Sequence, residues 1–328
     1  MPIHRKEYTE DTNIILIDTM QFDLQEITTA FCYYDGQTAL LMDVGTSDNV
    51  KTVLETLPSK GVPLEKLSGI VLTHYHFDHG GGTSTLWNIM KDKNPGFRIF
   101  TTSTTKNLLN NAGAHLTGAQ TTFGPFVGTM EPLPDEAFVL VEPDGYLPVE
   151  FETGAKIKLV HTPGHTPDHC SPCVFQGKEA VFLFAGEACG THYNPSKIIT
   201  GSTSMPPNFD FDTYMQSVEK MSLLYPQAVG FGHFGVISGE EDTKTLFKEH
   251  TGFMRTFRDE VYKAFKEKPS TGHVLEATAP LWEERLNPEH INAPGSDLFY
   301  GNLKLAVTYG MLVSLGLRES RYEPRQEA

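Results

Sequence analysis

The chain has 328 residues, 39% of them hydrophobic and 20% charged, which is enough to bury a substantial core. Its formal net charge of −15 argues against a nucleic-acid surface, which would show basic clusters. No run approaches the roughly 18 apolar residues of a membrane span, and residues 1–11 lack an apolar signal segment. Four cysteines in a chain of this length do not form a disulfide framework. We therefore expect a cytoplasmic protein with no membrane contact.

The first third of the chain reads as short strands followed by helices. Apolar runs at 13–18, 27–34 and 39–43 predict three strands of a β-meander, with Asp35-Gly36 as the turn between the last two. Helical spacing predicts a helix over 47–57, which leads into a strand ending at Thr73. A helix over 80–91 and a strand over 98–102 follow.

Residues 104–147 show no clean period and are rich in glycine, alanine, asparagine and threonine. We therefore expect an insertion rather than sheet. It is a candidate lid over a substrate site. The alternative is a surface excursion packed on its own apolar residues.

The second half repeats the pattern, with predicted strands at 156–160, 180–185 and 228–232 and a helix at 210–224. Helices are predicted after residue 233, at 242–266, 272–284 and 301–316, and a frayed tail from Glu319. We expect a core over 1–235 and a helical C-terminal element over 236–328. That element is a candidate cap or homodimer interface.

Three histidines and an aspartate fall within six consecutive residues, directly after the apolar run 69–72. Side chains at i and i+2 of an extended backbone point the same way, so His74 and His76 can hold one ion together. The following turn aims Asp78 and His79 at a point a few ångströms further on. Imidazole and carboxylate together favour a metal site that keeps water.

This H-x-H-x-D-H run resembles the signature of the metallo-β-lactamase superfamily. Three later stretches match further motifs of that family in the expected order: HTPGHT at 161–166, LFAGE at 183–187 and GFGH at 230–233. An upstream Asp43 resembles the acid of the family's early Asp-x-Gly turn, which supports the ligands. The resemblance implies an α+β fold, the four-layer αββα sandwich.

The resemblance also implies two divalent metal ions, with zinc as the first choice and iron or manganese as alternatives. The implied ligands are His74, His76 and His165 for one ion and Asp78, His79 and His233 for the other, with Glu187 between the two. Most family members carry aspartate at the position of Glu187. Because the longer side chain changes the reach of the carboxylate, the choice between one ion and two stays open.

Residues near these motifs have weaker assignments. Asp78 is counted as catalytic as well as a ligand. His192 and Tyr193, in the loop after Glu187, are candidate proton donors to a leaving group, with loop anchoring as the alternative. For His161 and His169 we expect a role in supporting the ligands or a structural role, rather than ligation.

The cysteines and phenylalanines near the motifs are also interpreted. Cys170 and Cys173 have the spacing of a redox or metal pair, and Cys189 lies two residues after Glu187, but for all three we favour a buried structural role. Phe231 and Phe234 predict a partly apolar pocket, which suits an acyl compound better than a bare phosphate.

These observations favour a metal-dependent hydrolase whose metal-bound hydroxide attacks a small ester, lactone, thioester or phosphoester. The expected partner is a small-molecule substrate, with no nucleic acid. Two alternatives stay open. One is a mononuclear iron oxidoreductase resembling persulfide dioxygenases, and the other is a catalytically weak metal-bound sensor.

Overall fold

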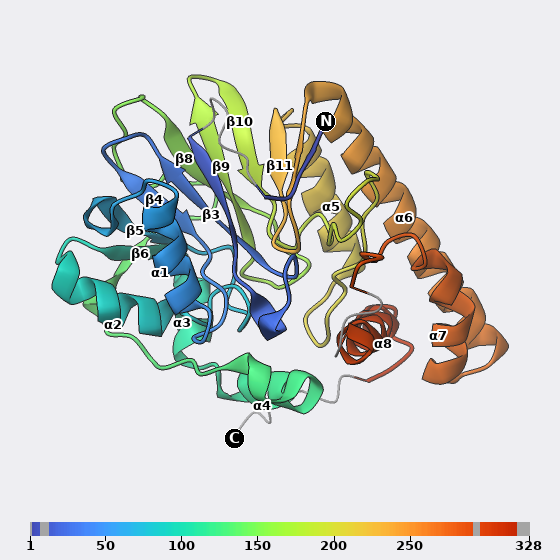
Figure 1. Ribbon diagram of the computed structural model, residues 1–328. Coiled ribbons are helices and arrows are strands. Elements are labelled where there is room, and N and C mark those ends of the chain that lie inside the picture. Colours follow the sequence, from blue (N-terminus) through green and yellow to red (C-terminus); the bar gives the residue numbers. More distant parts are fainter. Residues whose placement is uncertain (1, 7–12, 291–295, 320–328) are drawn as a thin grey trace.

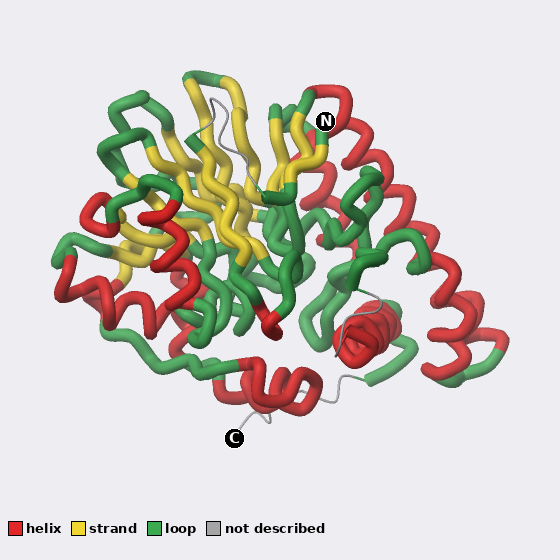
Figure 2. The backbone as a smooth tube through the Cα atoms, viewed as in Figure 1, coloured by secondary structure: helices red, strands yellow, loops and turns green. Residues whose placement is uncertain are grey.

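The computed structural model describes residues 2–6, 13–290 and 296–319, and within them the strands form two mixed six-stranded sheets. Figures 1 and 2 show the two sheets face to face, with helices on their outer sides. This arrangement is the predicted αββα sandwich, so the expected fold class is confirmed.

The first sheet comes from one continuous stretch of chain. Strands β2, β3 and β4 are antiparallel neighbours, as the predicted meander requires, and β4, β5, β6 and β7 pair in parallel. In sheet order the strands are β2 (Ile14–Asp18), β3 (Thr29–Tyr34), β4 (Ala39–Met42), β5 (Leu67–Val71), β6 (Arg98–Thr101) and β7 (Phe138–Leu140).

The second sheet contains three strands that the sequence did not predict, β1, β9 and β12. The antiparallel strand β9 joins β8 to β10, and β12 pairs with both β11 and the N-terminal β1. In sheet order the strands are β1 (Ile3–His4), β12 (Val236–Ser238), β11 (Ala228–Gly230), β10 (Glu179–Phe184), β9 (Cys170–Gln176) and β8 (Lys156–His161).

A core of large side chains fills the space between the sheets. Alternate residues of a strand face opposite sides, and in β3 Phe31 points between the sheets while Cys32 points toward the helices. Phe31 meets Phe182 and Phe184 of β10 edge to face, at ring-centroid distances of 5.1 and 5.0 Å. This contact fixes the two sheets against each other and thereby places the loops at their ends.

The helices divide between the two outer faces. Those of the first half cover the first sheet, and those of the second half share one apolar core with the second sheet. In chain order the helices are α1 (Val50–Ser59), α2 (Thr83–Lys93), α3 (Ser103–Asn110), α4 (Gly113–Phe123), α5 (Phe211–Ser222), α6 (Glu240–Glu267), α7 (Thr271–Thr278) and α8 (Ser296–Ser314).

Helix α2 begins three residues later than predicted, because Gly80, Gly81 and Gly82 belong to the preceding loop. A Cβ on Gly81 would lie 2.0 Å from the carbonyl oxygen of Phe77. Only glycine lets the backbone pass this closely. The glycine run therefore closes the loop that carries the histidine motif.

The expectation that 104–147 contains no sheet was wrong. Strand β7 lies in this segment and pairs with β6 at the edge of the first sheet. Helices α3 and α4 occupy much of the rest. Figure 1 shows α4 across one end of the sandwich, with α8 beside it. A lid role for α4 stays a prediction.

The chain after residue 235 begins with β12 and continues as helices α6 to α8. Helix α7 ends at Thr278, earlier than predicted, since a 3-10 turn with Pro280 follows it. Helix α8 starts at Ser296, earlier than the predicted 301. Most of the predicted tail, from residue 320, lies outside the described residues. Across the described ranges, no helix is long and apolar enough to cross a membrane.

Candidate metal centre

Four loops, each following a strand, bring the predicted ligands together. The loop after β5 is closed by the glycine run, and those after β8, β10 and β11 meet it from the second sheet. They supply His74, His76, Asp78 and His79 from the first loop, then His165, Glu187 and His233 from the other three.

The first group consists of His74, His76, His165 and Glu187, whose ligand atoms all lie within 4.8 Å of one another. The carboxylate oxygen Oε2 of Glu187 lies 2.8 Å from Nε2 of His165 and 3.2 Å from Nε2 of His74. Nδ1 of His76 lies 3.1 Å from Nε2 of His165 and 3.8 Å from the same oxygen. Four donor atoms thus surround one point.

The second group consists of Asp78, His79 and His233. Nε2 of His79 and Nε2 of His233 are 3.3 Å apart. Oδ2 of Asp78 lies 3.4 Å from Nε2 of His233 and 3.8 Å from Nε2 of His79. Asp78 retains 15% exposure of its side chain and His76 retains 13%. The centre is therefore open to solvent on the side of these two residues.

Glu187 lies between the groups. Its Oε2 is 3.4 Å from Nε2 of His79, and its Oε1 is 3.7 Å from Nε2 of His233. Its backbone N–H donates to Nε2 of His169 at 3.2 Å. The longer side chain thus reaches both groups, and His169, expected to play a supporting part, holds the backbone of Glu187 in place.

Asp43 orients two of the histidines from behind. Its carboxylate accepts the Thr73 hydroxyl at 2.6 Å and Nδ1–H of His79 at 3.2 Å. The Thr73 hydroxyl oxygen in turn lies 3.0 Å from Nδ1 of His74. Nδ1 of each ring is thus held by a partner, which turns Nε2 toward the centre.

Backbone carbonyls orient two more histidines in the same way. Nδ1–H of His165 donates to the carbonyl of Thr203 at 2.7 Å, and Nδ1–H of His233 donates to that of Ile27 at 2.8 Å. These bonds leave Nε2 of both rings available as a ligand atom.

The donor geometry fits a bound cation. Ligand atoms at 2.0–2.1 Å from a tetrahedral zinc ion lie about 3.3 Å apart, close to the separations in both groups. Among the described residues, Nε2 of His74 is buried and has only the Glu187 carboxylate nearby, at 3.2 Å, as expected of an atom that serves a metal. The two groups and the fold together indicate that the protein binds divalent metal.

The protonation states also match such a role. Burial alone would raise the pKa of Glu187, but the neighbouring imidazoles, His165 foremost, hold it well below its usual value. For Asp78 the effect of burial is likewise overcome, by the charge of His79, and its pKa falls to about 2. Burial lowers the pKa of His74. Both carboxylates are therefore anionic at neutral pH, and His74 is neutral.

The two candidate proton donors occupy different surroundings. Nε2 of His192 lies 2.9 Å from the carbonyl of Lys197, and its ring stacks on Phe231. These contacts support the loop-anchoring alternative for His192. The Tyr193 ring lies 6.1 Å from that of His233, and burial raises its pKa, so its hydroxyl stays protonated. Proton donation by either residue stays a prediction.

Other residues near the motifs are structural. Cys170 and Cys173 lie on opposite faces of β9, one between the sheets and the other under the helices, so they form no redox pair. Cys189 is also buried. Phe231 and Phe234 are fully buried in the core, so the expectation that they line a pocket was wrong.

His115 is a neighbour of the centre that the sequence did not suggest. It comes from α4 and stacks on His76 with ring centroids 4.7 Å apart. No periodicity or motif marks this position, because a lone histidine in an aperiodic segment carries no signal of its own. Only the fold, which lays α4 beside the histidine loop, brings it to the centre.

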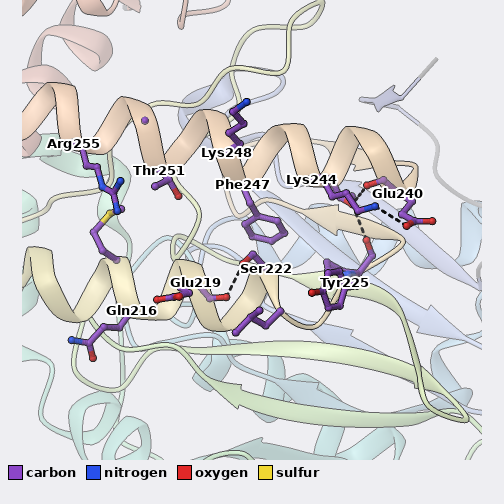
Figure 3. A pocket seen from close by; sticks show the side chains of 15 residues that line it. Gln216, Glu219, Ser222, Tyr225, Glu240, Lys244, Phe247, Lys248, Thr251 and Arg255 are labelled. Atoms are coloured by element: carbon purple, nitrogen blue, oxygen red, sulfur yellow. Dashed lines mark hydrogen bonds and ion pairs between the residues drawn. The ribbon is translucent and has the colours of Figure 1, made fainter.

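A separate surface groove runs between α5 and α6 (Figure 3). Its walls include Met215 and Phe247, and Lys244 pairs with Glu240 at one end. None of its lining residues belongs to either ligand group. The groove is thus distinct from the metal centre.

Comparison with known families agrees with this site. The family model described as the metallo-beta-lactamase superfamily matches residues 25–233, which include all seven ligand candidates. The chain belongs to this superfamily. Membership of the metallo-beta-lactamase superfamily suggests a hydrolase, without specifying its reaction.

Individual superfamily relatives span most of the chain. A metallo-beta-lactamase fold-containing protein from Sulfurisphaera tokodaii is 30% identical over 66% of this chain and 76% of its own length. A solved archaeal superfamily protein from Sulfolobus tokodaii is 26% identical, covers 72% of this chain and 85% of its own, and has a TM-score of 0.57. An atrochrysone carboxyl ACP thioesterase from Aspergillus fumigatus is 26% identical over 68% of this chain, which spans 40% of that longer protein.

A solved metallo-beta-lactamase family protein from Thermus thermophilus superposes over 93% of both chains with a TM-score of 0.62. At 15% identity it supports the shared fold alone.

Proposed function

We propose that this protein is a dinuclear metal-dependent hydrolase acting on a small carbonyl compound, with an ester or thioester as the preferred class. The observation that carries the proposal is the position of the Glu187 carboxylate, with one oxygen near His165 and His79 and the other near His233. A carboxylate placed between two ligand groups can serve both. We propose zinc as the first choice of metal, with iron or manganese as alternatives.

When bound, two divalent ions supply a water that ionises near neutral pH and an electrophilic partner for the substrate carbonyl. The chain's own part is to hold the ligands in place. Asp43 and the carbonyls of Thr203 and Ile27 fix the imidazole tautomers. Tyr193 keeps its proton at neutral pH and, lying against His233, is the candidate donor to a leaving group.

Aromatic side chains adjoin the second ligand group and favour an apolar acyl portion. The ring centroid of Tyr193, near His233, lies 6.2 Å from that of Phe299 in α8. The ring centroid of Phe22 lies 5.2 Å from that of Phe299 and 5.2 Å from that of the exposed Phe126. An aromatic series thus runs from the centre to the surface, which suits a ligand with an apolar body and one reactive polar group.

Phe22 sits in an unusual backbone conformation. Its φ of 59° is in the left-handed region, which bulky residues rarely adopt, and Met20 and Asp23 share this region. Such conformations persist where the surroundings over-determine them, often at ligand sites. We propose that the 20–23 loop presents Phe22 to the acyl group.

The charges near the centre disfavour a bare phosphate. Across the described residues, no lysine or arginine side chain pairs with either ligand group, whereas phosphate sites commonly use such cations. The thioesterase name of one relative supports the same choice. A cytoplasmic location and a homodimer through α6 to α8 remain our expectations.

Elemental analysis of protein purified without added metal, combined with assays on a thioester, a lactone, an ester and a phosphodiester, tests the proposal. We expect close to two ions per chain and turnover of a thioester or ester. His165→Ala should lose metal and reduce turnover by at least about 100-fold, because it removes a ligand of the first group.

His161→Ala is the matched control, since His161 belongs to the same motif and its side chain lies outside both groups. It should leave metal content and turnover unchanged. One iron per chain without hydrolysis would instead indicate the oxidoreductase alternative. Absence of tightly held metal would favour the sensor.

A further inference from the structure

One ligand candidate is held differently from the other four histidines. His74, His79, His165 and His233 all present Nε2 to the centre and have a partner at Nδ1. His76 presents Nδ1 instead. Within the described part of the chain, its Nε2 makes no hydrogen bond. Unlike the other four rings, this ring is thus not held in its plane by a described protein group at its second nitrogen.

The His115 ring lies parallel to that of His76, with an interplanar angle of 1° and centroids 4.7 Å apart. Its Nε2 accepts the backbone N–H of Phe77 at 3.1 Å, so its own proton is on Nδ1. His115 is therefore neutral, and it can stack on a ligand imidazole without opposing a cation.

Helix α4, which carries His115, is itself anchored. Near its other end, Nδ2 of Asn302 in α8 donates to the carbonyl of Thr122 at 2.7 Å. The ring of Phe123 packs on Phe77 at 5.7 Å. The C-terminal end of the helix thus contacts both α8 and the histidine loop, which keeps His115, near its start, over His76.

We propose that His115 is a positioning residue, whose stacking on His76 fixes a ligand of the first metal and makes the metal affinity of that site depend on α4. The inference rests on the proposed function only in requiring that the first group bind a divalent ion. The stack matters more than the hydrogen bond to Phe77, because that N–H is only partly buried and water can replace the acceptor.

Cobalt(II) is a suitable probe, since its visible spectrum reports ligand geometry without any substrate. We expect His115→Ala to weaken binding at the first site by about tenfold, the lower end of the range for groups that support metal ligands, and to alter the spectrum. Affinity would be measured by competition with a chelator of known strength.

Two further variants separate the contacts. His115→Phe keeps an aromatic face and loses the acceptor, so it should restore affinity to within about threefold of the wild type. His115→Gln keeps an acceptor without the ring, and should resemble His115→Ala. Gln120→Ala, an exposed position on the same helix, should change nothing.

The proposal is overturned if His115→Ala binds cobalt with wild-type affinity and spectrum, or if His115→Gln restores binding while His115→Phe does not. Thermal unfolding of the metal-free variants checks that the fold is intact. A wild-type protein that binds cobalt but hydrolyses nothing would defeat the proposed hydrolase and leave this test valid.

Discussion

At the scale of single residues, Glu187 has the most consequential position in the centre. Its Oε2 lies within 3.4 Å of His74, His79 and His165, so this one oxygen contacts both ligand groups. The extra methylene relative to aspartate allows this reach. The choice between one ion and two therefore depends on its charge and its length.

Glu187→Gln should reduce the metal content from about two ions per chain to one or fewer. The amide keeps the size of the side chain but removes the negative charge that offsets two cations, and amides are poor ligands for zinc. Elemental analysis after dialysis measures the effect. Glu187→Asp keeps the charge and should retain both ions. Equal metal content in the wild type and the glutamine variant would contradict the bridging position.

The residues that sequence reasoning found and missed differ in kind. His74, His76 and the later motif residues were predictable because the spacing within each motif and the order of the motifs can be read from the sequence without knowing the fold. His192 was selected for its closeness in sequence to Glu187, yet its ring contacts the carbonyl of Lys197. His115 is distant from every motif and depends on how α4 folds back.

At the scale of elements, long periodic helices and apolar strands were predictable and short or atypical strands were not. Strands β1 and β12 have two and three residues, too few for a pattern. Strand β9 contains Pro172, which normally argues against a central strand. Its existence depends on pairing with β8 and β10, which is information about tertiary structure.

Helix α6 is tied to the neighbourhood of the centre through a buried histidine. Nδ1 of His250 lies 2.8 Å from the Thr200 hydroxyl, and its Nε2 lies 2.8 Å from that of Tyr214 in α5. The Tyr214 hydroxyl also donates to the carbonyl of Glu187 at 3.2 Å. Burial lowers the pKa of His250 to about 3, and the charge of Arg285 adds to this.

This shift makes stability sensitive to acid. Because the folded pKa lies below the unfolded value of about 6.5, the contribution of neutral His250 is complete above pH 6.5 and is lost as pH falls toward 3. The stability advantage of the wild type over His250→Gln should therefore shrink by about 2 to 3 kcal/mol between pH 6.5 and 4. Urea unfolding of the metal-free proteins measures it, and the comparison cancels the other histidines. A difference that stays constant with pH would refute the argument.

At the scale of the whole molecule, the C-terminal helices share a core with the second sheet. Val307 and Met311 of α8 and Phe257 of α6 belong to the same buried cluster as Leu183 of β10. The boundary at residue 235 marks a change in the sequence pattern, and the apolar core extends across it. Whether the outer side of these helices also forms a dimer stays a prediction.

Metal removal should lower the thermal stability of the entire protein. Ions that bind only the folded state stabilise it by about 2.7 kcal/mol at 100 times their dissociation constant. For a chain of this size we expect a fall of about 5 °C in Tm with excess chelator, restored by added zinc. A His165→Ala variant should show a smaller fall. An unchanged Tm in the wild type would mean that the ions are not held by the folded centre.

The two sheets are built, apart from β1, from successive halves of the chain, with 141–155 connecting them. The first ligand group takes His74 and His76 from one half and His165 and Glu187 from the other, and the second group also draws on both. Neither half alone therefore offers a complete coordination sphere. Metal binding therefore requires that both halves are folded and docked correctly. It adds stability to the assembled protein and none to a half that has folded by itself.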